Sequence, residues 1–122
     1  MNAAKATSAY IAAALTWLAV PMVGLAGLSA SATPWEGLHT GKVALTVAIV
    51  AAHALAGAVL LLYGAGAAGY SVTAPVVGLQ VVATVSLSYL WSLRLLVGGF
   101  LAVAATVLAV AALVVSRPSG PD

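Results

Sequence analysis

The sequence predicts an all-α membrane protein, a four-transmembrane-helix bundle with both termini on the same side of the bilayer. Hydrophobic residues make up 64% of the chain and charged residues only 5%. Four apolar stretches approach the roughly 20 residues that a helix needs to cross a bilayer. The charges all lie near the ends of these stretches, at Lys5, Glu36, Lys42, Arg94, Arg117 and Asp122. There they can reach water, whereas a charge in the hydrocarbon would cost about 3 kcal/mol.

The first span is expected at about residues 9–28, with Pro21 in its interior and the turn-forming Ser29 and Pro34 after it. A cleaved signal peptide is a rival interpretation, but the apolar stretch exceeds the usual 7 to 15 residues or so. The second span is expected at about 43–63 and the third at about 74–91, separated by a glycine-rich break. The fourth is expected at about 95–115. The turn before it falls at Ser92-Leu93-Arg94 or at Gly98-Gly99.

Aromatic residues support this threading, because Tyr and Trp prefer the headgroup level of a membrane. In a four-span chain they would gather at both ends, as Tyr10, Tyr63 and Tyr70 on the terminal side and Trp35, Tyr89 and Trp91 on the other. Orientation is not specified, since each side carries two Lys or Arg residues. Such a balance suits a weak orientation signal that the N-terminal segment decides, a protein that is oriented by its partners, or one that inserts both ways and forms antiparallel dimers.

Small residues on the fourth span recur at alternating steps of four and three. This helix-packing stripe consists of Gly98, Ala102, Ala105, Ala109 and Ala112. Close backbone approach is a main source of helix association in lipid, so the stripe predicts a helix contact. The contact is either with the first or third span of the same chain or with another chain.

Polar residues inside the spans predict a second feature, an intramembrane polar seam. Gln80, Thr84 and Ser88 recur every four residues on the third span. Thr46 and His53, seven apart on the second span, share a face. We expect His53 to be buried between helices and hydrogen-bonded to Gln80, Thr84 or the Trp17 carbonyl, which Pro21 leaves without a helical donor. The functional alternatives for His53 are a proton-handling group and a haem or metal ligand.

The haem alternative depends on His39 and His53, which have thirteen residues between them. Fourteen helical steps place them within about 40° of one face and about 21 Å apart. This spacing resembles that of membrane b-type cytochromes, and Glu36-Gly37-Leu38-His39 resembles the Glu-x-x-His of haem A synthase. The resemblance implies haem ligation by both histidines. The third and fourth spans lack a His, and Thr40 replaces the Arg of haem A synthase, so an opposing ligand would have to come from a homodimer or another subunit.

The chain is also similar to small multidrug resistance transporters in length, in its four spans, in its balanced charge and in the small-residue stripe. That resemblance implies a dual-topology small transporter. Those proteins carry a carboxylate within the first span, whereas the nearest one here, Glu36, belongs to a loop.

Catalysis is not expected. There is no Cys, no phosphate loop, no metal motif and no nucleic-acid-binding surface. The cluster Glu36, His39, Thr40 and Lys42 is interpreted as a solvated loop. These observations favour a multi-pass cell-membrane protein without a cofactor, which is an accessory or assembly subunit of a larger membrane complex such as a respiratory one. Its expected partners are the lipid bilayer and other membrane subunits, or a second copy of itself.

Overall fold

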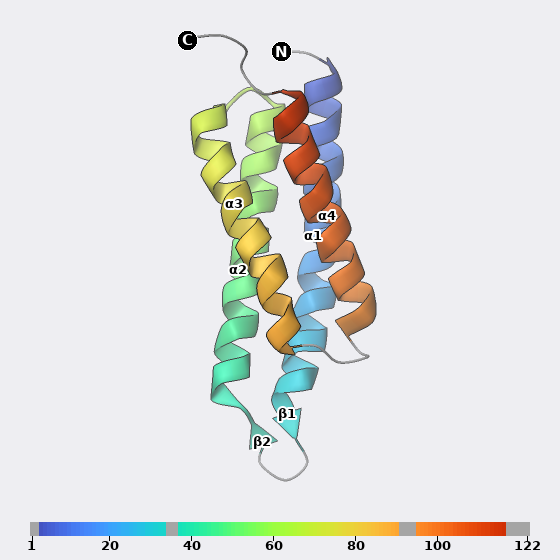
Figure 1. Cartoon of the computed structure of the whole chain (residues 1–122), viewed down its shortest axis with the longest axis vertical. Helices are drawn as coiled ribbons and strands as arrows, with labels where there is room; N and C mark the ends of the chain where they lie inside the picture. The colour runs from blue at the N-terminus through green and yellow to red at the C-terminus, as the bar shows by residue number, and fades with distance from the viewer. Residues whose placement is uncertain (1–2, 34–36, 91–94, 117–122) are drawn as a thin grey trace.

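The computed structural model describes residues 3–33, 37–90 and 95–116. They form the helices α1 (Ala3–Ser31), α2 (Thr40–Gly64), α3 (Tyr70–Ser86) and α4 (Leu96–Val115), with a short 3₁₀ helix, η1 (Leu87–Leu90), after α3. Four of the described helical segments are long and apolar enough to cross a membrane. The predicted four-helix bundle is therefore confirmed as a fold (Figure 1).

The helices pack around a closed ring in the order α1, α2, α3, α4, so that α1 and α3 lie across the bundle from each other. The start of α1 and the end of α4 lie at one end of the bundle, which we call the termini end (Figure 1). At the opposite, hairpin end, the strands β1 (Ala32–Thr33) and β2 (Gly37–Leu38) form an antiparallel pair between α1 and α2. Each strand has two residues, and the two-stranded sheet lies in the connection between the two helices.

One predicted boundary shifts, because Pro75 was counted as part of a helix break; Pro21 lies inside its helix, as the sequence predicted. Helix α1 continues through Pro21, and α3 begins at Tyr70, so that Pro75 lies inside it. Each proline removes one backbone donor, but the flanking turns retain their hydrogen bonds. Between α2 and α3 the chain reverses at Gly66, whose φ of 82° lies in the left-handed region that glycine adopts without strain.

The turn between the third and fourth spans was predicted at two alternative places. The Gly98-Gly99 alternative is wrong, because both glycines are buried within α4. Ser92-Leu93-Arg94 lies outside the described residues. After α3 the chain continues as η1, where Leu87 and Leu90 are buried.

Buried apolar side chains form two clusters, one toward each end of the bundle. The hairpin-end cluster consists of Ala19, Val23, Ala26, Ile49, Ala52, Ala83, Leu87, Leu90, Leu95 and Ala102. The termini-end cluster consists of Ala9, Ala12, Ala13, Leu60, Tyr63, Val77, Ala109 and Leu113. Alanine dominates both clusters, so the helices approach closely.

Candidate functional site

Polar side chains from all four helices lie between the two apolar clusters. We call this group the polar layer; it consists of Thr16 on α1, His53 on α2, Gln80 and Thr84 on α3 and Thr106 on α4. Thr16, His53 and Gln80 have at most 1% of their surface exposed. Buried ionisable groups at mid-depth of a membrane bundle are functional-site candidates, so the layer is the natural place to look for chemistry.

His53 is hydrogen-bonded through both ring nitrogens. Its Nδ1 lies 2.9 Å from the Ile49 carbonyl oxygen, and its Nε2 lies 3.4 Å from Thr84 Oγ1. A carbonyl oxygen only accepts, so Nδ1 carries a hydrogen and, in neutral His53, Nε2 accepts from Thr84. Thr84 Oγ1 also lies 2.7 Å from Thr106 Oγ1, which is within 2.7 Å of the Ala102 carbonyl oxygen. A single hydrogen-bonded chain thus links α2, α3 and α4.

Gln80 makes the connection across the bundle to α1. Its Nε2 donates to Thr16 Oγ1 at 3.0 Å, and Thr16 donates to the Ala12 carbonyl oxygen at 2.7 Å. The other amide atom, Gln80 Oε1, is buried and has no partner among the described residues. Together with the His53 chain, this bond gives every helix a polar contact at the same level of the bundle.

The predicted polar seam is realised only in part. The expected bond from His53 to Thr84 is confirmed, and Gln80 is buried as expected. Ser88 was predicted to continue the seam, and this is wrong: it is exposed. Two steps of four residues turn it about 80° around the helix axis from Gln80, and Leu87 and Leu90 face inward instead. Thr46 is buried but does not join the layer. It donates to the Lys42 carbonyl at 2.8 Å and packs at Gly27, where an added Cβ would lie 2.6 Å from Thr46 Cγ2.

Sequence reasoning missed Thr16 and Thr106. Both lie in the interior of their spans and bond to the carbonyl four residues earlier, which makes them resemble ordinary helical threonines. Depth matching could have found them, since they lie near the middle of α1 and α4 as His53 does in α2. The signal for these two residues is that each lies about as far from the ends of its own span as His53 does, whereas spacing along one helix carries no information about them.

The small-residue stripe lies inside the bundle. Ala102, Ala105, Ala109 and Ala112 have no exposed surface, and Gly98 is buried. A Cβ added at Gly98 would lie 3.0 Å from the Met22 carbonyl carbon of α1. Of the two interpretations left open by the sequence, packing within the chain therefore holds for this fold, and the stripe is not free to receive a partner.

His39 caps a helix. Its Nδ1 accepts from the Lys42 backbone N–H at 3.2 Å, and its side chain is exposed at the start of α2. Of the other members of the loop cluster, Thr40 is exposed, and Glu36 lies outside the described residues. The described residues contain no group of three or more His, Cys, Asp or Glu side chains that could hold a metal ion. Haem ligation by His53 would require Nε2 to leave Thr84.

At the termini end, a second set of polar contacts joins three helices. Lys5 Nζ lies 4.2 Å from the centre of the Tyr63 ring, and Tyr63 Oη lies 2.6 Å from Ser116 Oγ. Ser116 donates to the Ala112 carbonyl at 2.6 Å, so Tyr63 donates to Ser116. The aromatic belt predicted that Tyr63 would face lipid headgroups. Its side chain is instead fully buried, where it contacts α1 and the end of α4.

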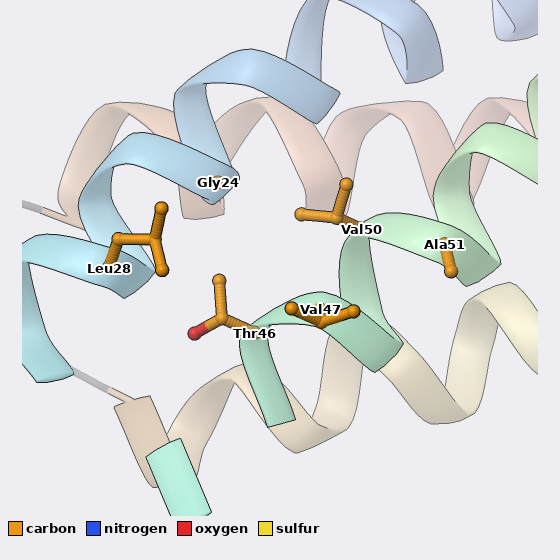
Figure 2. A pocket seen from close by; sticks show the side chains of 6 residues that line it. All are labelled: Gly24, Leu28, Thr46, Val47, Val50 and Ala51. Atoms are coloured by element: carbon orange, nitrogen blue, oxygen red, sulfur yellow. The ribbon is translucent and has the colours of Figure 1, made fainter. Parts of the chain in front are cut away.

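A groove of about 290 Å³ runs along the outer surface between α1 and α2. Figure 2 shows the six residues that line it: Gly24 and Leu28 on α1, and Thr46, Val47, Val50 and Ala51 on α2. Apart from Thr46, the lining is apolar. Gly24 and Ala51 are small residues, so another helix could approach the backbones of α1 and α2 closely along this α1–α2 groove.

Comparison of the sequence with protein-family models, and of the chain with curated proteins and solved structures, finds no match. The functional argument therefore depends on the polar layer and the α1–α2 groove alone.

Proposed function

We propose that this chain is a multi-pass cell-membrane protein that acts as a non-catalytic accessory or assembly subunit of a larger membrane complex, respiratory complexes being one such setting. The α1–α2 groove is the observation that carries the proposal. The groove is outward-facing and apolar, and it contains small residues on both sides. The small residues of the α4 stripe are used within the chain, whereas Gly24 and Ala51 lie at the outer surface.

The occupant that we propose is one apolar transmembrane helix of another subunit. A helix satisfies its own backbone polar groups, so it can enter a groove that offers no hydrogen-bonding partners. The only polar group in the lining, the Thr46 hydroxyl, already donates to Lys42. Gly24 and Ala51 would allow the two backbones to approach closely, which is the main attraction between helices in lipid. The two-against-two charge balance also suits a chain whose orientation is set by such a partner.

A matched pair of glycine substitutions tests the proposal. A Cβ at Gly24 would meet only Val50 Cγ2, at an ordinary contact distance of 3.5 Å, and one at Gly78 would meet nothing within 4 Å. Leucine at either position should therefore leave the bundle folded, but only Gly24→Leu fills the groove. Native mass measurement after mild-detergent purification from the native membrane should show the complex for wild type and Gly78→Leu. Gly24→Leu should be recovered as the free chain.

Retention of the complex by Gly24→Leu would contradict the proposal, as would recovery of the wild type only as a free chain. A photo-crosslinker at Val47 separates a helix from a lipid occupant, because it should label a defined protein in the native membrane. Labelling of lipid alone would assign the groove to acyl chains. A crosslinker at Val107, on the exposed face of α4, serves as the control.

The haem and transporter hypotheses make different predictions for protein expressed alone. A Soret band that is lost on His53→Ala would favour a haem-binding dimer, and uptake of lipophilic cations by proteoliposomes would favour a transporter. Under our proposal the isolated chain is colourless and transports no cations.

A further inference from the structure

We propose that the polar layer binds one internal water molecule, which donates a hydrogen bond to Gln80 Oε1 and connects the Thr16–Gln80 pair to the His53–Thr84–Thr106 chain. This site is independent of the α1–α2 groove and of any partner. The starting observation is that Gln80 Oε1, on a side chain with no exposed surface, has no hydrogen-bond partner within residues 3–33, 37–90 and 95–116. An unbonded amide oxygen is strongly disfavoured in an apolar interior, so a donor is required.

The side chains of the layer cannot supply that donor. The Thr16 hydroxyl gives its hydrogen to the Ala12 carbonyl, so it can only accept from Gln80 Nε2. This also fixes the amide with Nε2 toward Thr16. In the other chain, Nδ1–H of His53 donates to Ile49. Thr84 and Thr106 have one hydrogen each for three contacts: to His53 Nε2, to each other and to the Ala102 carbonyl. Several hydrogens of the layer are given to main-chain carbonyls, which only accept. Too few hydrogens are then left for the remaining side-chain acceptors of the layer.

The ligand must therefore bring hydrogens, and it must also be small and uncharged. Ala56 and Ala105 are fully buried and belong to neither apolar cluster, so along α2 and α4 they lie at the level of the layer. Both are small side chains, and a single water molecule is the smallest ligand that brings hydrogens. A cation is disfavoured because no Asp or Glu lies within any of the four helices. Water meets both conditions and can make the two to four bonds typical of a buried site.

The second partner of the water follows from the helical repeat. Gln80 and Thr84 are four residues apart in α3, so their side chains are neighbours on one face. A water that donates to Gln80 Oε1 can donate its second hydrogen to Thr84 Oγ1, whose own hydrogen goes to His53 Nε2. The two groups would then form one network through all four helices, and the water would lie one hydrogen bond from the donor to His53 Nε2.

Water-edited solid-state NMR of the labelled protein in phosphatidylcholine bilayers tests the site. Magnetisation should pass from water to the Gln80 side-chain amide and the His53 ring. At the same mixing time the flanking Val77 and Ala83 side chains should give no signal. Both residues are buried, but they lie in the apolar clusters. Gln80→Leu should abolish the transfer to His53. Thr73→Val, which removes a buried hydroxyl that bonds only within its own helix, should leave the transfer unchanged.

The wild-type spectrum alone can overturn the proposal, so the test does not depend on every variant folding. Build-up at Gln80 no faster than at Val77 would show that the amide is dry. Unchanged transfer to His53 in a folded Gln80→Leu protein would show that water reaches the ring by another route. Thr84→Val provides a further check, because loss of the second partner should reduce the transfer at Gln80.

Discussion

The α1–α4 contact and the polar layer hold the same bundle together in different ways. Between α1 and α4 the contact is close packing of two backbones, which alanine and glycine allow. An added Cβ at Gly98 would lie only 3.0 Å from the Met22 main chain. In the polar layer the contact consists of a few hydrogen bonds between side chains 22 to 64 residues apart in the sequence. The first kind is spread over a whole helix, whereas the second depends on individual atoms.

This difference predicts how each region responds to mutation. Close backbone contact leaves no room for bulk and should be broken by added atoms, because main chain cannot rotate away. Hydrogen bonds between transmembrane helices are worth about 0.6 kcal/mol on average, so the loss of one layer contact should weaken the fold without breaking it.

The largest effect is expected for Ala105→Leu combined with Ala109→Leu. Both alanines are fully buried in the stripe, and each leucine adds three carbon atoms to a filled interface. We expect the isolated chain to lose at least about 2 kcal/mol of stability, and in practice to fail to form a compact bundle. Detergent unfolding followed by circular dichroism measures this loss. Unchanged stability with loss of a partner protein would instead place the stripe at an intermolecular contact.

A smaller loss is expected for Gly98→Ala, where a single methyl group meets main chain. We expect destabilisation of about 1 to 3 kcal/mol, against a small gain of up to about 1 kcal/mol for Gly78→Ala, which replaces glycine by a better helix former in open space. The same unfolding titration compares the two. Equal effects at both positions would mean that α1 does not approach Gly98.

In the layer, Thr84→Val should cost about 0.6 to 2 kcal/mol, because it removes the hydroxyl shared by His53 and Thr106 while keeping the side-chain volume. A double-mutant cycle with Thr106→Val should give a coupling energy of at least about 0.5 kcal/mol, since the two hydroxyls contact each other directly. Additive losses would show that the chain across α2, α3 and α4 is not formed.

The finest detail that the account predicts is which nitrogen of the His53 ring carries the hydrogen. Because the Ile49 carbonyl can only accept, neutral His53 should carry its hydrogen on Nδ1 and leave Nε2 bare. The ¹⁵N spectrum of selectively labelled protein distinguishes the two nitrogens, and exposed His39 provides an internal reference. A hydrogen on Nε2 of neutral His53 would reverse the assigned direction of the bond to Thr84.

The two regions also show how far the sequence could predict this molecule. The helices and the stripe were visible because repeated apolar and small residues leave a periodic signal. The polar layer was found only where its members repeat on one helix, as Gln80 and Thr84 do. Thr16 and Thr106 are single residues whose partners depend on how the helices are docked. Ser88 was misplaced because a spacing of four residues, repeated twice, drifts about 80° around the helix from Gln80.

The central claim is that α4 packs its small-residue stripe against α1 of the same chain, so that the stripe is not the surface proposed to receive a partner helix. The chain contains no Cys, so introduced pairs can be oxidised without background. Ala19→Cys with Ala102→Cys, two positions in the hairpin-end cluster, should crosslink within one chain in lipid bilayers, whereas Ala19→Cys with the exposed Val107→Cys should not. Intact mass and digestion separate a closed monomer from a linked dimer. A closed monomer from the first pair alone is the predicted result, and a dimer linked through Cys at positions 19 and 102 would contradict it.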